Sequence, residues 1–390
     1  MYKKSSPIVT AIRIPKNSAD IGYRIFKGDC EKWFEKLDKI CRNKAKLIYL
    51  DPPYNTKRNR GARSYFSDNN DCWTEFMQNV LKKSHSYLKK SGFLVISINQ
   101  MEMFNLKNIA EEIFPHGFVG VFPVKTRHHE RQLMINATFH NVYEYLLIFR
   151  KSKSTRFYSS HAPYDLKEFC YDIRILNDSP IKKQIGGKTV EIYKNNQYKI
   201  TKLQPSKTRF RKYMISGKIA TANWSGAIYE KYIKNLGANL LVKVHGLDKK
   251  GLGYRWFITP FSTNKRGLYF QHTSSAGRPL LFTNFLDYTD IITKIYSEGG
   301  PGCDFKDSKK PEELIGKLLE VTTKKHDLVL DFFGGSGTTL VSCIKHGRSC
   351  ITIEKNNEAL KTMYTRLKNM HKGKDLDGKK YKFIVKRHKL

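Results

Sequence analysis

The sequence lacks the features that mark a secreted, zinc-bound or membrane-inserted chain. Its seven cysteines include no Cys-x-x-Cys pair, which argues against a zinc site or a disulfide framework. No apolar run approaches the length of about 18 residues that a membrane helix needs, and the first residues lead into no apolar segment. We therefore expect no metal, no membrane contact and a reducing, cytoplasmic location.

Acidic residues are also scarce. Asp and Glu number 35 against 71 Lys and Arg, which gives a formal net charge of +36. Such a charge favours a polyanionic partner, because lysine and arginine neutralise phosphates and release counterions. Nucleic acid is the leading candidate, and a generally basic surface without a specific partner is the alternative. Hydrophobic residues still make up 40% of the chain, enough for a globular core.

The apolar pattern predicts an α/β fold whose core is split into two parts of the chain. Short apolar runs alternate with helix-like stretches, as in a doubly wound, mostly parallel sheet with crossover helices, and we expect an antiparallel strand at one edge. The expected strands are Tyr23–Phe26, Ala45–Leu50, Phe93–Ile98, Phe118–Val124, Tyr143–Phe149, Leu328–Phe333 and Cys350–Ile353. The expected helices are Trp73–Leu88, followed by a turn at 89–92, and Pro311–Val321.

The periodicity weakens between 151 and 300, where glycine and asparagine turn signals divide the chain into short pieces. Residues 181–220 contain 11 Lys and Arg with tyrosines between them, and Glu191 as the one acid. This composition suits contacts to phosphates and bases, although a solvated basic surface is the alternative. The predicted parts are 1–150 (first core half), 151–300 (DNA-binding insertion), 301–372 (second core half) and 373–390 (basic surface tail).

The tetrad Asp51-Pro52-Pro53-Tyr54 directly follows the apolar residues 46–50. The carboxyl ends of strands are where α/β sheets place active sites. An exocyclic base amine is a poor nucleophile, and the Asp51 carboxylate with the Pro52 carbonyl would accept its two N–H groups. Pro53 would stiffen the turn and Tyr54 would stack on a base turned out of the duplex. The alternative is an ordinary turn.

A second motif, Asp331-Phe332-Phe333-Gly334-Gly335-Ser336-Gly337-Thr338-Thr339, also follows an apolar strand and opens a helix. Its glycines would let a cofactor approach the backbone. Glu354 ends the next strand about 20 residues beyond Gly335, the spacing of an acid that binds ribose hydroxyls. The loop lacks the Gly-Lys-Ser/Thr of a triphosphate site. S-adenosylmethionine fits, with Asp331 and Lys310 as partners for its methionyl ammonium and carboxylate.

With these motifs placed, the chain resembles the amino-methyltransferases of the β arrangement, in which Asp-Pro-Pro-Tyr precedes the cofactor loop. Phe333-x-Gly335-x-Gly337, Lys310-Pro311-Glu312-Glu313-Leu314-Ile315 and Gly28-Asp29-Cys30 resemble elements of that family. The resemblance implies a Rossmann-like methyltransferase sheet with an inserted target-recognition lobe, and an aspartate, here Asp29, near the cofactor adenine. The expected cofactor-binding residues are Asp29, Lys310, Asp331, Phe333, Gly335, Gly337, Thr338 and Glu354.

The resemblance implies a site-specific methyltransferase that acts on N6 of adenine in double-stranded DNA, similar to modification subunits of restriction–modification systems. A cognate restriction endonuclease and a second copy of the chain are the implied partners. Asn55-Thr56 resembles adenine-modifying members, whereas cytosine-N4 enzymes more often carry Ser in place of Asp51. The alternatives are a cytosine-N4 or RNA amino-methyltransferase, and a non-catalytic DNA-binding specificity protein.

Two stretches depart from the pattern or suggest other chemistry. Tyr143-Glu144-Tyr145 stands where relatives usually carry His-Glu-Tyr. His128-His129-Glu130 contains metal-ligand residue types, but adjacent residues on a basic loop rarely converge on one ion. We expect that loop to face DNA or solvent.

Overall fold

The computed structural model describes residues 8–13, 22–54, 70–130, 139–161, 164–215, 224–249, 251–261, 265–275, 279–291, 295, 297–304 and 309–389. The chain forms two compact units: Met1–Ser160 with Leu281–Leu390, and His161–Leu280. The predicted insertion, 151–300, is longer at both ends than this second unit. No helix in the described part of the chain is long and apolar enough to span a membrane.

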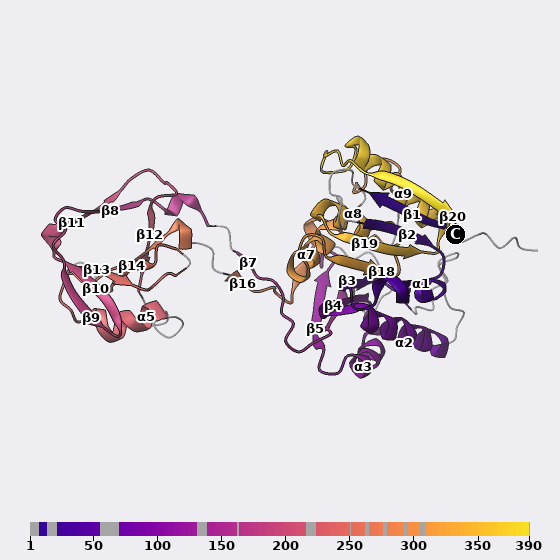
Figure 1. The fold of residues 1–390 in the computed structure, drawn as a ribbon, viewed down its shortest axis with the longest axis horizontal. Helices are drawn as coiled ribbons and strands as arrows, with labels where there is room; N and C mark the ends of the chain where they lie inside the picture. The colour runs from indigo at the N-terminus through magenta and orange to yellow at the C-terminus, as the bar shows by residue number, and fades with distance from the viewer. Residues whose placement is uncertain are drawn as a thin grey trace, which may run out of the picture. The chain divides into compact units, whose positions relative to one another are not determined.

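The first unit is an α/β structure (Figure 1). Its strands are β1 (Ile8–Arg13), β2 (Gly22–Lys27), β3 (Ala45–Leu50), β4 (Leu88–Ile98), β5 (Phe118–Lys125), β6 (Tyr143–Arg150), β17 (Leu286–Asp287), β18 (Leu328–Asp331), β19 (Ser349–Glu354) and β20 (Ile384–Lys389). Its helices are α1 (Glu31–Cys41), α2 (Asn70–Tyr87), α3 (Met103–Ile113), η6 (Thr289–Ile291), α7 (Glu312–Thr322), α8 (Thr338–His346) and α9 (Asn357–Lys372). The predicted strands and helices are confirmed, with ends shifted by a few residues.

The ten strands form one sheet in the order β17-β5-β6-β4-β3-β18-β19-β2-β1-β20. The central strands, from β4 through β3, β18 and β19 to β2, are parallel. Antiparallel pairing, expected at one edge, occurs toward both: β6 pairs antiparallel with β4 and β5 near the edge that β17 forms. Within the expected tail, β20 pairs antiparallel with β1 and forms the other edge, which the sequence did not predict.

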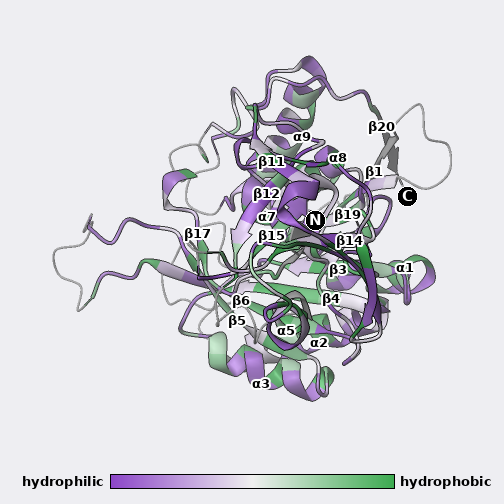
Figure 2. Ribbon diagram, turned by 90° about the vertical axis from the view of Figure 1, so that its left-hand side faces the viewer, coloured by the Kyte–Doolittle hydropathy of each residue, from purple (hydrophilic) through white to green (hydrophobic). Residues whose placement is uncertain are grey.

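Alternate side chains of the central strands enter two separate apolar layers. Ile48 and Leu50 of β3 pack with α1, α2 and α3, whereas Leu47 and Tyr49 pack with α7, α8 and α9. Both faces of the sheet are therefore covered, which explains why the parallel strands read as continuous apolar runs. Figure 2 shows this as green strands at β3 and β4, while α3 carries both green and purple residues, as an amphipathic helix does.

The predicted turn at 89–92 is wrong, because these residues belong to β4. Ala45 of β3 pairs with Leu88 and Leu47 pairs with Phe93, so the register shifts between the two pairs. The strand therefore absorbs the extra residues as an irregularity instead of ending.

The order of the strands reverses between β3 and β18. From β3 the chain passes through α2 to β4, and from β18 it passes through α8 to β19 on the other side. In open α/β sheets, ligands bind outside the carboxyl ends of the strands at such a point. The two motifs singled out from the sequence follow these two strands, so the sheet brings them together.

The second unit is an antiparallel sheet in the order β11-β8-β12-β15-β14-β13-β10-β9. Its elements are η2 (Leu166–Glu168), β8 (Tyr171–Ile175), β9 (Ile181–Ile185), β10 (Lys188–Tyr193), η3 (Asn195–Gln197), β11 (Tyr198–Lys202), β12 (Phe210–Met214), α5 (Trp224–Ile228), η4 (Tyr229–Ile233), β13 (Leu241–His245), β14 (Tyr254–Ile258), β15 (Leu268–His272) and η5 (Thr273–Ser275). Tyr229 and Ile233 of η4 cover one face, and Trp256 and Phe270 are buried on the other. Short strands β7 (Ser160–His161) and β16 (Pro279–Leu280) pair where the chain enters and leaves this unit.

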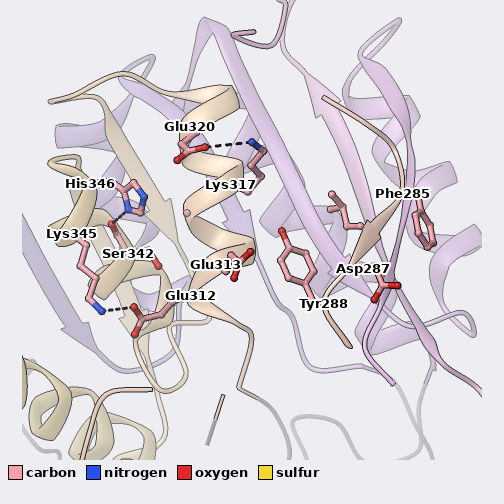
Figure 3. Close-up of a pocket in the computed structure, with 12 residues that line it drawn as sticks. Phe285, Asp287, Tyr288, Glu312, Glu313, Lys317, Glu320, Ser342, Lys345 and His346 are labelled. Atoms are coloured by element: carbon pink, nitrogen blue, oxygen red, sulfur yellow. Dashed lines mark hydrogen bonds and ion pairs between the residues drawn. The ribbon is translucent and has the colours of Figure 1, made fainter. Parts of the chain in front are cut away.

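A buried ion network supports the carboxyl end of the first sheet. Arg366 of α9 is fully buried and donates to the Ser336 carbonyl and to the Thr338 hydroxyl in the glycine loop. Its second terminal nitrogen, Nη2, lies 2.5 Å from Glu312 Oε1 at the start of α7. Lys345 lies 2.6 Å from the second oxygen of that carboxylate, and Figure 3 marks this ion pair with a dashed line. Arg366 thus links the glycine loop to the start of α7.

Replacing Arg366 with Met should lower the free energy of unfolding by about 3 kcal/mol, because it leaves buried polar groups without their cation. The comparison is Arg24→Met, an exposed arginine on β2, for which a change within about 0.5 kcal/mol is expected. Urea unfolding of both variants measures the difference. Equal losses in the two variants would contradict a supporting role for the network.

Candidate functional site

The tetrad predicted to be catalytic lies at the carboxyl end of β3. The Tyr54 hydroxyl donates to an Asp51 oxygen at 3.1 Å and lies 3.1 Å from the Ser97 hydroxyl at the end of β4. It accepts a hydrogen bond of 2.9 Å from the Lys310 ammonium. These contacts fix the orientation of the Tyr54 ring. Asn55-Thr56, which follow the tetrad, lie outside the described residues.

Lys310 is the charged centre of this cluster. Its ammonium lies 3.3 Å from Asp51 Oδ1 and 2.6 Å from Glu144 Oε2, and its side chain is 12% exposed. Burial acts to lower the pKa of Lys310, but the carboxylates of Asp51 and Glu144 outweigh it and raise that pKa well above its usual value. Lys310 is therefore a cation at the tetrad, and its expected contact with a methionyl carboxylate stays a prediction.

The backbone of the tetrad is held by Trp73 of α2. The Trp73 indole N–H donates to the Pro53 carbonyl at 2.9 Å, and Trp73 itself is fully buried. This bond engages the Pro53 carbonyl and leaves the Pro52 carbonyl as the predicted acceptor for a substrate amine. Proline at both positions also restricts the backbone, so the turn is stiff before any ligand binds.

The glycine loop after β18 is built around two buried carboxylates. Glu354, 6% exposed at the end of β19, accepts the N–H of Gly335 with one oxygen and the N–H of Asn356 with the other, both at 2.6 Å. Burial raises the pKa of Glu354, while these N–H groups oppose the shift. A carboxylate held in this way keeps lone pairs for further donors, as the two hydroxyls of a ribose would require.

Asp331 is the second carboxylate, and it is 2% exposed. Burial raises the pKa of Asp331 to about 7, and the described groups that lower it most are the hydroxyl of Thr339 and the N–H of Phe333. The Phe333 N–H donates to it at 3.0 Å. A buried acid held by neutral donors is stabilised as an anion by a ligand cation, so it fits the ammonium of a methionyl group.

Gly335 and Gly337 both adopt left-handed backbone conformations, with φ of 51° and 83°. A Cβ added at Gly337 would lie 2.6 Å from Met363 Cγ, whereas one at Gly335 would meet nothing closer than the Phe333 carbonyl at 3.8 Å. Gly337 is therefore required by packing against α9. The open space at Gly335 agrees with a cofactor that approaches the backbone there.

Three other predicted cofactor residues are Phe333 and Thr338, which belong to the loop, and Asp29, which precedes α1. Phe333 packs edge-on against Phe76 with the ring centres 6.0 Å apart. Asp29 accepts the N–H of Glu31 at the start of α1. The Thr338 hydroxyl accepts from Arg366, as described above, so it is engaged within the protein. Contacts of all three with a cofactor stay predictions.

Sequence reasoning missed Ser97, Glu144 and Trp73. Glu144 lies in the Tyr-Glu-Tyr stretch that departs from the family pattern, so a signal was present although its partner, Lys310, is distant in sequence. Trp73 is visible only as the first apolar residue of a predicted helix. Ser97 carries no signal in the sequence.

Two further features of the described residues do not join this site. A pocket of 570 Å³ lies along α7, with Tyr288, Glu313 and Lys317 among its lining residues (Figure 3). It contains no residue of the tetrad or of the glycine loop. His129 lies 3.6 Å from the exposed Glu130, and among the described residues no three His, Cys, Asp or Glu side chains are grouped to hold a metal ion.

Comparison with known proteins gives consistent results. A family model described as DNA methylase matches residues 45–365. The chain is 25% identical, over 90% of its length, to the probable type III restriction-modification enzyme HindVI Mod subunit of Haemophilus influenzae, and it spans only 50% of that protein. It is 25% identical, over 87% of its length, to the type II methyltransferase M.KpnI of Klebsiella pneumoniae, of which it spans 82%. The crystal structure of the M1.HpyAVI-SAM complex aligns over 88% of this chain and 98% of its own chain. The sequence identity is 14% and the TM-score is 0.41.

Gly335→Ala should weaken cofactor binding with little loss of stability, because the added methyl group enters open space that the cofactor needs. We expect roughly a tenfold weaker Kd for S-adenosylmethionine, which is about 1.4 kcal/mol, and about 1 kcal/mol of backbone strain. Gly337→Ala should cost more stability, because its methyl group meets Met363.

Calorimetric titration and urea unfolding measure the two effects. The matched control is Gly187→Ala in the second unit, which has φ of 72° and open space around the position. It should show the strain without the loss of cofactor affinity. Unchanged cofactor binding by Gly335→Ala would remove this glycine from the cofactor site.

Proposed function

Because the chain belongs to the DNA methylase family, we propose that it transfers a methyl group from S-adenosylmethionine to the N6 amino group of adenine in double-stranded DNA. Membership confirms the predicted methyltransferase fold and cofactor. The observation that carries the proposal is the adjacency of Asp51–Tyr54 and Asp331–Gly337 at the ends of two neighbouring parallel strands. One motif holds the amine and the other holds the methyl donor.

The chain's own groups supply the positioning that the reaction needs. The Asp51 carboxylate and the Pro52 carbonyl accept the two N–H groups of the amine and so direct its lone pair away from the ring. Tyr54, with its hydroxyl held in the cluster, presents a ring face to a base turned out of the duplex. S-adenosylmethionine, when bound, supplies a methyl group activated by a positively charged sulfur. Asp51 need not be a strong base, because the amine proton becomes acidic after methylation.

Adenine is favoured over cytosine by an aspartate at position 51, where cytosine-N4 enzymes more often carry Ser. Methylation of cytosine N4 is the second candidate, since the matched family model is named for both N6 and N4 methylases. The two reactions use the same amine chemistry, so only the modified base distinguishes them. The third candidate is methylation of an amino group in RNA at the same site.

The unit His161–Leu280 is proposed to recognise the target sequence. Cations lie over aromatic rings on its strands: Arg211 over Tyr213 at 4.4 Å, and Lys243 over Tyr254 at 4.6 Å. Surfaces of this kind suit phosphates and exposed bases. Since relatives are named as parts of restriction–modification systems, a cognate endonuclease and a second copy of the chain are proposed partners, and the cytoplasm the proposed location.

Modification-sensitive sequencing tests the reaction on unmethylated DNA incubated with the protein and S-adenosylmethionine. N6-methyladenine should appear at one short motif. Asp51→Asn, which keeps the shape but removes the charge, should lower the rate at least about 10²-fold. The control is Asp38→Asn, which loses a surface ion pair with Lys83 on α2 and should methylate normally.

The modified base decides between the candidates. N4-methylcytosine at a recurrent motif would show that the target is cytosine N4, the second candidate, and not adenine N6. Methylation of RNA alone, or no modification of any nucleic acid, would contradict the proposed DNA substrate.

A further inference from the structure

Two carboxylates share one ammonium group beside the tetrad. Asp51 follows β3, Glu144 lies on β6, and Lys310 precedes α7, so three elements from distant parts of the chain contribute the three charges. The Lys310 ammonium is 2.6 Å from Glu144, 2.9 Å from the Tyr54 hydroxyl and 3.3 Å from Asp51. Binding of the amine by Asp51 and Pro52 does not by itself require a second carboxylate at this position.

The geometry uses the full donor capacity of the lysine. An ammonium has three hydrogens and no lone pair, and Lys310 has three oxygen partners around it. Its nitrogen also lies 5.3 Å from the centre of the Tyr54 ring, within the range of a cation–π contact. Lys310 therefore has a single defined position, and it contacts both side chains that the proposed reaction requires.

We infer that Lys310 and Glu144 are positioning residues for methyl transfer: Lys310 keeps the Asp51 carboxylate ionised and directs it at the amine, and Glu144 holds Lys310 in place. This inference rests on the proposed function. Neither residue needs to touch the base. Both act through Asp51 and Tyr54, which do.

The charge balance of the cluster supports this role. With Asp51, Glu144 and Lys310 all ionised, the cluster carries one net negative charge. The amine nitrogen becomes positive as it gains the methyl group, and a fixed negative environment stabilises that charge without reorganisation. Without Lys310, two carboxylates would face one another across the site, and one of them would tend to take up a proton. A protonated Asp51 accepts hydrogen bonds poorly.

The pKa of Asp51 reports this arrangement. Burial raises the pKa of Asp51, the Lys310 cation acts to lower it, and Glu144 raises it further. Tyr54 donates to the same carboxylate, and Tyr49 and Asp331 are further ionisable groups nearby among the residues that the structure describes. Removing the lysine charge should raise the pKa of Asp51, and removing the Glu144 charge should lower it.

The test is the dependence of kcat on pH for the full chain, with DNA and S-adenosylmethionine saturating. Activity requires ionised Asp51, so the rate falls as pH falls through its pKa. The acidic limb should move up by about one pH unit in Lys310→Met and down in Glu144→Gln. Lys310→Met should also lower kcat roughly 10²-fold at neutral pH, and Lys310→Arg should keep the limb near its wild-type position. Shifts in opposite directions are not expected from structural damage.

Matched controls lie on the exposed face of α7. Lys317→Met and Glu320→Gln remove the same two charge types from a pair 3.5 Å apart, whose side chains are 38% and 54% exposed. Both should leave the pH profile unchanged. Calorimetric binding of S-adenosylmethionine should be within about twofold of wild type in Glu144→Gln, Lys317→Met and Glu320→Gln, which establishes that the cofactor site is folded. The Lys310 variants are not used for this control, because Lys310 is itself a predicted cofactor-binding residue.

The outcomes separate this inference from the proposed function. Suppose that the wild-type protein methylates DNA, but the acidic limbs of Lys310→Met and Glu144→Gln both stay at the wild-type pH or both move in the same direction. The inference is then overturned, and the proposed function stands. If Lys310→Met does not fold, the Glu144→Gln variant decides. An acidic limb that stays at its wild-type pH in this variant overturns the inference. A wild-type protein that modifies no DNA would overturn the proposed function first.

Discussion

The parallel pairing of β3 with β18 is the constraint on which the site depends. Ile48 lies opposite Leu330 and Tyr49 opposite Asp331, so the chain emerges from both strands at the same edge of the sheet. A shift of one residue would turn every side chain of a strand to the other face, and the two apolar layers prevent such a shift. Asp51 and the glycine loop are therefore brought together by the register of two strands that are far apart in sequence.

Buried charge is distributed around this edge in two connected groups. Lys310 faces Asp51 and Glu144, while two residues further along the chain Glu312 faces Arg366, which also holds the glycine loop. A buried cation needs a partner of opposite charge, and its removal leaves that partner uncompensated. The short Lys310–Glu312 segment consequently couples the position of the Asp51 carboxylate to that of the glycine loop, so neither half of the site can move far alone.

Sequence reasoning located what is local and missed what is made by tertiary contact. Asp51–Tyr54 and Asp331–Gly337 were found because each motif directly follows an apolar strand, and Glu354 was found by its spacing. Ser97 contributes a single hydroxyl from a strand that the register places beside the tetrad, and no local pattern indicates it. Glu144 lies in a stretch that departs from the family pattern, but its partner Lys310 is distant in sequence. Lys310 was identified by its motif, but only the fold shows which carboxylates it faces. The edge strand β20 was missed because its lysines and arginines read as a solvated tail.

On the proposed function, the position of the inserted unit would let one chain combine fixed chemistry with variable recognition. The chain leaves the first unit shortly after β6, which carries Glu144, and returns through β17, which pairs with β5, before it reaches Lys310. The Glu144–Lys310 pair therefore joins the segments on both sides of the insertion, directly beside Asp51. Because these contacts form within the first unit, residues of the unit His161–Leu280 can change without altering the surroundings of the Asp51 carboxylate. Recognition of different sequences would then require new residues only in the insertion, while the same charged cluster continues to orient the reacting groups.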